Sequence, residues 1–256
     1  MTSKSSNSRP NILVVYYSFT NQTHRVSEVM IREFERLGCN ATACRIELDD
    51  PRYRIQWPFK PLIPKFLRWF FPQVTGRVGK VKVPAEVLES EEYDLVCVGS
   101  PTWFLNPALP VSSFLKTPEA EQLLAGGKPF AVFTVCRKFW WNNLRVVKKL
   151  AKNRGGKFLD GAAFCFEGNQ IQTALSCLGY FQTGKDQERV FGIRVYRFGI
   201  PEEGLDKARE FASRLVRMTV GASLITQTEW FSSYDLQFIF QGLSKSGSCI
   251  LVFDFS

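Results

Sequence analysis

Apolar runs alternate with amphipathic segments along most of the chain, and this alternation predicts strands separated by helices. The first apolar run covers residues 12–17 and is rich in β-branched and aromatic side chains, as in a strand buried on both faces. Apolar residues then recur at helical spacing until Gly38, which suits a helix end. Four further strands are expected at residues 41–46, 95–99, 130–135 and 157–166. We therefore predict an α/β fold with a doubly wound, five-stranded parallel sheet.

The remaining pattern divides the chain into one domain with a leader and an extension. Helical turns are predicted at 110–115 and 119–124, and longer helices at 144–151 and after Pro201. Residues 167–200 are interrupted by glycines and are expected to be irregular. The polar residues 1–10 are expected to form a disordered leader and residues 11–220 the domain, whereas residues 221–256 form a C-terminal extension that no pattern assigns.

Residues 49–84 break the alternation and form an insertion after the second strand. This segment is rich in proline, basic and aromatic residues, and the prolines exclude a long regular helix, although residues 65–71 suit a short one. Three roles are open for the insertion: it covers the core, it lines a pocket for an apolar substrate, or it docks on an anionic membrane surface. If it lines a pocket, Trp57 and Phe59 are its substrate-facing residues.

Composition narrows the classes of function. The net charge of +9 favours anionic ligands or surfaces, but no nucleic-acid-binding motif is present, so no nucleic acid partner is expected. The seven cysteines form no CxxC pair, and a single histidine is present, so we expect reduced thiols and no metal site. Without a signal peptide or a membrane-spanning apolar run, we expect a cytoplasmic protein.

The first predicted strand ends in a turn with five hydroxyl and amide side chains: Ser18, Thr20, Asn21, Gln22 and Thr23. Because a helix begins there, unpaired backbone N–H groups and the positive end of the helix dipole lie at this turn. With the hydroxyl groups they make a candidate phosphate site that lacks a lysine. The alternative is that Ser18 or Thr20 only caps the helix.

A second loop follows the third predicted strand and contains Ser100, Pro101, Thr102, Trp103 and Phe104. Open α/β sheets bind ligands at the carboxyl ends of their strands, so an aromatic ring here can stack on a planar ligand. The alternative is that the two aromatic rings only cover the core.

A third loop follows the fourth predicted strand and contains Cys136, Arg137, Lys138 and Trp140. The two cations and a helix N-terminus are expected to lower the pKa of Cys136, as in reactive cysteines. The alternative is that Cys136 packs as a small apolar residue. Tyr180 and Phe181, from the irregular region, are expected to reach the same site.

The three loops together suit a flavin mononucleotide. They lack both the dinucleotide fingerprint and the Walker loop, whereas a phosphate seat beside two aromatic loops fits the phosphate and flat ring of FMN. Ser18-x-Thr20-x-x-Thr23, with Trp103 after the third strand, resembles the flavodoxin superfamily, which implies a flavodoxin-like sheet and FMN held by the three loops. Asn21 stands where glycine is common in that superfamily, and asparagine tolerates positive φ better than most residues.

A closer resemblance is carried by Trp57-Pro58-Phe59 and by residues 103–110, 113–120 and 135–140. These stretches resemble the dialkylresorcinol condensing enzyme family over roughly residues 11–218 of this chain. The resemblance implies a flavin-dependent aromatase that oxidises a dialkyl cyclohexanedione, made by a separate ketosynthase, to a resorcinol. Claisen condensation is not expected, because the sequence holds no cysteine–histidine–asparagine arrangement and its one histidine, His24, lies in the first turn.

The expected roles follow from loop position. Arg137 or Lys138 stabilises an enolate oxygen, and Cys136 is a candidate for redox or nucleophilic chemistry. The substrate pocket is expected to include Trp57, Phe59, Phe104 and Tyr180.

Other functions remain open on the same fold. One is an NAD(P)H-dependent quinone or enone reductase; others are an electron carrier and a non-catalytic binding protein. NAD(P)H or O₂ is the expected redox partner, and the resemblance implies a homodimer.

Overall fold

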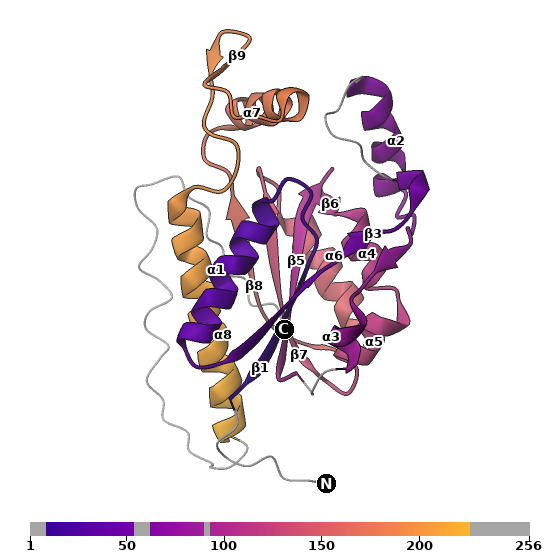
Figure 1. The fold of residues 1–256 in the computed structure, drawn as a ribbon, viewed down its shortest axis with the longest axis vertical. Helices are drawn as coiled ribbons and strands as arrows, with labels where there is room; N and C mark the ends of the chain where they lie inside the picture. The colour runs from indigo at the N-terminus through magenta and orange to yellow at the C-terminus, as the bar shows by residue number, and fades with distance from the viewer. Residues whose placement is uncertain (1–8, 54–61, 90–92, 226–256) are drawn as a thin grey trace.

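The computed structural model describes residues 9–53, 62–89 and 93–225 and has a parallel sheet at its centre (Figure 1). The five main strands are β1 (Asn11–Tyr16), β2 (Asn40–Arg45), β5 (Leu95–Trp103), β7 (Pro129–Cys136) and β8 (Lys157–Cys165). They are all parallel and lie in the order β2-β1-β5-β7-β8. This confirms the predicted flavodoxin-like, doubly wound sheet. The strand order reverses direction between β1 and β5, which makes their carboxyl ends the topological switch point.

Helices cover both faces of the sheet because β1 is apolar on both sides. Ile12, Val14 and Tyr16 pack with α1 (Gln22–Arg36) and α8 (Glu202–Ile225). The alternate residues Leu13 and Val15 pack on the opposite face. The helices on that face are α3 (Ala85–Glu89), α4 (Leu109–Phe114), α5 (Pro118–Leu124) and α6 (Trp141–Lys152). The predicted turns at 110–115 and 119–124 are thus confirmed as α4 and α5.

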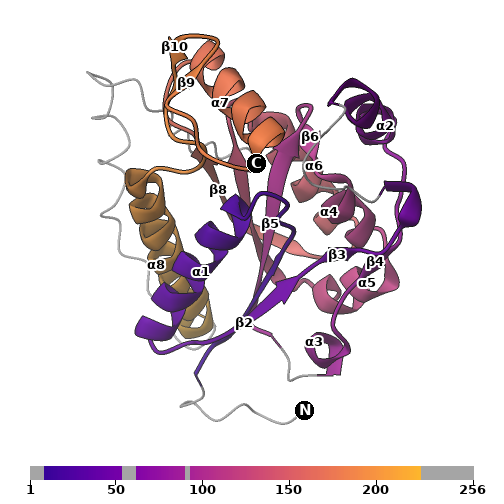
Figure 2. The same cartoon turned by 45° about the horizontal axis from the view of Figure 1, so that its top comes forward.

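Two helical segments stand above the carboxyl ends of the strands, on opposite sides (Figures 1 and 2). One is α7 (Gln170–Thr183), which is followed by the hairpin β9 (Arg189–Val190) and β10 (Ile193–Arg194). The other belongs to the predicted insertion, whose described elements are the 3₁₀ turn Pro51–Tyr53, α2 (Leu62–Val74) and β4 (Val81–Lys82). The strand β4 pairs with β3 (Glu47–Leu48), which lies just before the insertion. The carboxyl ends of the strands are therefore flanked by α7 and α2, two helices that the five-stranded α/β fold does not itself require.

The expectation that prolines exclude a long helix from the insertion is wrong, because α2 has 13 residues. Pro64 falls in its first turn, where a backbone N–H has no helical partner to lose. Pro72 lies in the last turn, where it removes the bond that its own N–H would donate, and the helix ends two residues later at Val74. Between these two positions the helix carries no proline.

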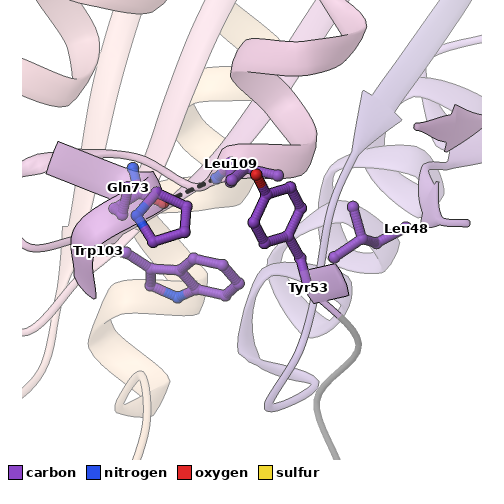
Figure 3. Close-up of a pocket in the computed structure, with 6 residues that line it drawn as sticks. Leu48, Tyr53, Gln73, Trp103 and Leu109 are labelled. Atoms are coloured by element: carbon purple, nitrogen blue, oxygen red, sulfur yellow. Dashed lines mark hydrogen bonds between the residues drawn. The ribbon is translucent and has the colours of Figure 1, made fainter. Parts of the chain in front are cut away.

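Gln73 anchors α2 to the rest of the domain. Its side chain is buried; Nε2 donates to the carbonyl oxygen of Pro107, and the backbone N–H of Leu109 donates to Oε1 at 2.9 Å (Figure 3). Nearby, the backbone N–H of Gly79 donates to Ser113 Oγ at 2.9 Å. Because buried polar groups need partners, these bonds fix the insertion on β6 (Asn106–Pro107) and α4.

The prediction of an irregular segment at 167–200 is also wrong, because α7 spans 14 of these residues. The helix holds no charged residue and no narrow apolar stripe, so helical periodicity does not reveal it. Its opening signal is present: the Asn169 side chain accepts from the backbone N–H of Gln172, and Gln172 Oε1 accepts from that of Asn169. This capping box is the signal that sequence reasoning missed.

Several expectations concern residues beyond the described part of the chain. Trp57 and Phe59 lie there, as do residues 1–8 of the expected leader and residues 226–256 of the expected extension. The helix α8 continues to Ile225, past the expected domain end at residue 220. Within the described ranges, no helix combines the length and apolar character needed to cross a bilayer.

Candidate functional site

A cavity of about 460 Å³ opens at the carboxyl ends of β1, β5 and β7. Its walls come from the three loops after these strands, from α7, and from Phe166 and Phe198. It therefore lies at the topological switch point, where open α/β sheets bind ligands. The three loops that the sequence analysis selected are brought together around one space.

The first loop contributes Thr20, Gln22 and Thr23 to the cavity wall. Ser18 is buried and does not line the cavity; its Oγ accepts a hydrogen bond from the backbone N–H of His24 at 3.1 Å. Ser18 thus serves the helix as a cap, as the alternative interpretation of this turn held. The first turn of α1 contains no acidic side chain, so its positive end is left open toward an anion.

Asn21 sits between the lining residues with a left-handed backbone, at φ 64° and ψ 0°. Its side chain makes no capping hydrogen bond to the helix. Asparagine tolerates positive φ better than most residues, and Asn21 adopts such a conformation here. The turn keeps this left-handed conformation without a glycine.

The side chain of Gln22 ties this turn to the segment that precedes α8. Its Oε1 accepts from the backbone N–H of Ile200 at 3.0 Å and from Arg25 Nη1 at 3.3 Å. Gly199 lies against the Gln22 carboxamide with φ 122°, so this approach depends on a residue without a Cβ. The groups left to face a ligand at this end are the two threonine hydroxyls and backbone N–H groups.

The second loop is a hairpin rather than an irregular turn. The strand β5 continues to Trp103 and pairs antiparallel with β6, leaving Phe104 and Leu105 as a two-residue turn. These two residues have φ values of 49° and 67°, which only glycine and asparagine adopt readily. Side-chain amides hold the turn: Asn106 Nδ2 donates to the Phe104 carbonyl at 3.0 Å, and Asn142 Nδ2 donates to that of Leu105 at 3.1 Å.

This hairpin places Pro101, Thr102, Trp103, Phe104 and Leu105 on the cavity wall. The expected residue Ser100 is buried and does not line the cavity. The strained turn thus presents two large apolar side chains to the ligand space.

Trp103 is held by neighbouring rings. Its ring meets Tyr17 edge to face at a centroid distance of 5.5 Å and Phe19 at 6.4 Å. Trp103 also lines a second, much smaller hollow beneath α2, of about 10 Å³, together with Leu48, Tyr53, Pro72, Gln73 and Leu109 (Figure 3). Of these two hollows in the described part of the chain, the larger one has the room that a cofactor needs.

Beneath the cavity, Asn143 of α6 joins the second loop to β7. Its Nδ2 lies 2.8 Å from Thr102 Oγ1 and 2.7 Å from Thr134 Oγ1, and the two hydroxyl oxygens are 2.9 Å apart. The Thr102 hydroxyl is therefore engaged with the protein interior. Thr102 shapes the wall of the cavity without offering a free hydroxyl.

The third loop brings Cys136, Arg137, Lys138 and Phe139 to the cavity. Phe139 has φ 51° and is half-exposed. Trp140 does not line the cavity; it is the residue that precedes α6. The two cations are the charged side chains of the wall within the described chain.

The expectation of a lowered pKa at Cys136 is wrong. A hydrogen bond to Cys165, whose Sγ is 3.4 Å away, and burial raise the pKa of the Cys136 thiol well above its ordinary value. Arg137 and Lys138 oppose this rise but do not overcome it. The pKa of the Cys165 thiol is instead lowered, because it shares this hydrogen bond and also lies near Lys138.

The helix α7 supplies another wall of the cavity, where Phe181 lies as expected but the other residues were not predicted. Its lining residues are small or apolar: Ala174, Cys177, Leu178 and Phe181. Tyr180, an expected pocket residue, does not line the cavity but stacks on Phe198, which does. This side of the cavity therefore lacks charge and suits an apolar ligand.

The described residues contain no group of three or more histidine, cysteine or acidic side chains that could hold a metal ion. No protein-family model matches the sequence, and no curated protein is similar to it. The chain is similar to a Lactobacillus acidophilus flavoprotein solved in complex with FMN (16% identity; 60% of this chain and 92% of that one; TM-score 0.46). It is also similar to an archaeal flavodoxin (12%; 82% and 99%; 0.47) and to a WrbA-like flavodoxin from Agrobacterium tumefaciens (16%; 83% and 98%; 0.44).

Proposed function

We propose that the cavity binds FMN and that the protein is an FMN-dependent oxidoreductase. The observation that carries the proposal is that one cavity joins the N-terminus of α1, with Thr20 and Thr23, to the aromatic loop of Trp103. A phosphate requires the first environment and a flat ring requires the second. The cavity volume of about 460 Å³ also lies in the usual range for small-molecule sites.

The residues suited to hold each part of FMN come from different loops. Thr20, Thr23 and the backbone N–H groups of the first turn suit the phosphate. The hairpin with Trp103 and the third loop with Cys136 suit the edges of the isoalloxazine ring. When bound, the flavin supplies hydride transfer.

We propose further that the substrate is a dialkyl cyclohexanedione, which is aromatised to a resorcinol. The cavity has apolar side chains on two of its walls, which suit alkyl chains and exclude water. They are Phe104 and Leu105 of the hairpin and Leu178 and Phe181 of α7. No carboxylate or histidine lines the cavity in the described part of the chain, so no general base of the usual kind is present. This favours a substrate with an acidic C–H between two carbonyls, because such a dione loses that proton to water and enters the site as its enolate.

The cations supply that stabilisation in the proposed reaction. Arg137 and Lys138 line the cavity and suit the enolate oxygens, where a fixed positive charge in a site shielded from water acts strongly. The alkyl chains of the substrate, packed on the apolar walls, hold the dione ring in place, while Arg137 and Lys138 orient its two oxygens. A ketosynthase reaction that joins two acyl chains would supply such a dione.

An NAD(P)H-dependent quinone reductase is the second candidate. The same two cations that suit an enolate also suit the phosphates of a dinucleotide. The two functions differ in the direction of electron flow through the flavin, so a single reaction with NADPH separates them.

The first experiment measures cofactor content. Purified protein should be yellow and release FMN on denaturation, and Thr20→Ala/Thr23→Ala should weaken FMN retention while Thr42→Ala, at an exposed position of β2, should not. A colourless protein that binds no added FMN would overturn the flavoenzyme proposal.

The second experiment measures turnover. A 2,5-dialkylcyclohexane-1,3-dione should bleach the bound flavin anaerobically and give one resorcinol per flavin, and admitting O₂ should reoxidise the flavin and permit further turnover. Rapid bleaching by NADPH, without bleaching by the dione, would establish the reductase instead. Arg137→Ala should slow dione oxidation; full turnover in that variant removes Arg137 from the reaction.

A further inference from the structure

Cys136 and Cys165 form a pair of thiols at the carboxyl ends of adjacent strands. They are register partners in the β7–β8 ladder, and their Sγ atoms lie 3.4 Å apart. Both are free thiols in this structure. Neighbouring strands lie about 4.8 Å apart, which falls within the Cα separation that a disulfide accepts. The pair is therefore close enough to be joined when the sulfur atoms approach to bonding distance.

The pair lies against the ligand space rather than in the distant core. Cys136 lines the cavity and Phe166, the neighbour of Cys165 in sequence, lines it as well. Cys165 itself is half-buried. A molecule in the cavity therefore contacts one thiol of the pair directly.

The two thiols differ in acidity in the way that dithiol redox couples require. The pKa of Cys165 is lowered by the hydrogen bond that it shares with Cys136 and by Lys138 and Lys207, although burial opposes this. The pKa of Cys136 is raised by that same bond and by burial. The thiolate is the reactive form of a thiol, so the more acidic member of the pair is the better placed to start an exchange.

We propose that Cys136 and Cys165 are a redox-active dithiol that exchanges one electron pair with the flavin in the cavity. The inference rests on the proposed FMN site. In the oxidation both S–H bonds break and one S–S bond forms; the two thiols lose two electrons and two protons to the oxidised flavin, which becomes the dihydroflavin. The reverse reaction passes the electron pair from the reduced flavin to the disulfide. The protein would then hold two electron pairs for each flavin.

Anaerobic reductive titration with dithionite tests this directly. Holoprotein first oxidised with diamide and freed of excess reagent should take up two electron pairs per FMN. Cys136→Ser and Cys165→Ser should each take up one. The matched control is Cys39→Ser, which changes a thiol that does not line the cavity and should retain the uptake of two pairs.

Peptide mapping of the wild-type chain keeps the test independent of how well the variants fold. Without reduction, the oxidised protein should yield a peptide pair linked through Cys136 and Cys165. FMN-bound protein that takes up one electron pair and yields no such link would overturn this inference and leave the flavin proposal standing. Protein that holds no FMN would overturn both the flavin proposal and the electron exchange, even if diamide joins the two cysteines.

Discussion

The ring of Tyr180 in α7 stacks on the ring of Phe198, with centroids 4.0 Å apart and planes inclined by 5°. Phe198 in turn meets Phe166 edge to face at 5.1 Å. Both phenylalanines line the cavity, whereas Tyr180 stands behind them. The stacked pair therefore joins α7 to the segment before α8 and keeps this wall in place.

Replacing Tyr180 should loosen that wall. Tyr180→Leu is expected to lower the free energy of unfolding by about 0.5–1.5 kcal/mol through the lost ring contact, beyond any change in buried area. It should also raise the dissociation constant of FMN, measured by the quenching of flavin fluorescence. Tyr180→Phe keeps the ring and should match the wild type; equal FMN affinity in the leucine variant would show that the stack does not support the site.

Asn21 should be replaceable by glycine but not by a β-branched residue. Glycine adopts the observed φ of 64° without strain, so Asn21→Gly should retain FMN binding and the melting temperature. Asn21→Val should lower stability by about 1–3 kcal/mol, because a β-branched residue is strained in the left-handed region. Thermal melting and FMN titration of both variants test this. A valine variant as stable as the glycine variant would contradict the assigned backbone conformation.

Gln73 should be needed to hold α2 on the domain. Gln73→Leu leaves the Pro107 carbonyl and the Leu109 N–H without their side-chain partner, which costs about 1–3 kcal/mol for a buried group. Denaturant unfolding measures the loss, and hydrogen exchange should rise across α2. Gln122→Leu is the control, since Gln122 is exposed and its bond to the Leu88 carbonyl is 3.3 Å long. Equal effects at the two positions would count against the anchoring role.

Glu33 should make stability depend on acid pH. Arg36 bonds both carboxylate oxygens, at 2.7 and 2.8 Å, and chiefly this lowers the pKa of Glu33 from 4.5 to about 2. Because the folded-state pKa is the lower one, this stabilisation is complete above pH 4.5 and is lost as the pH falls toward 2.

Urea unfolding at several pH values between 7 and 2.5 tests this account of Glu33. Glu33→Gln should reduce stability at neutral pH and flatten its decline in acid. Glu35→Gln, at an exposed position of the same helix, controls for the loss of one charge. A glutamine variant at position 33 with the wild-type acid profile would contradict the assigned cause.

The sequence predicts the sheet and its loops because both depend on local pattern. A strand such as residues 12–17 is apolar on both faces wherever it lies, and a polar turn such as Ser18–Thr23 announces the helix that follows. The carboxyl ends of parallel strands share one edge, so grouping the loops requires only the fold class. That is why Thr20, Trp103 and Arg137 could be assigned to one site before the structure was known.

The parts that sequence reasoning missed depend on contacts between distant segments. Most wall residues of α7, such as Ala174 and Leu178, face a cavity whose other sides come from far along the chain, so no local period marks them. The pairing of Cys136 with Cys165 depends on the register of β7 and β8, which shifts between Phe130 and Ala131. The length of α2 depends on the exact turns in which Pro64 and Pro72 fall.

The residues of the Phe104-Leu105 turn affect both the thermal stability of the protein and the lining of its cavity. Asn-Gly suits a two-residue turn with positive φ at both positions, and each strained residue costs on the order of 1–3 kcal/mol. Selection for heat resistance alone should therefore favour Asn-Gly here, at the loss of two apolar walls of the cavity. A library screened for melting temperature and one screened for turnover should diverge at these positions, so stability and activity compete within a single hairpin.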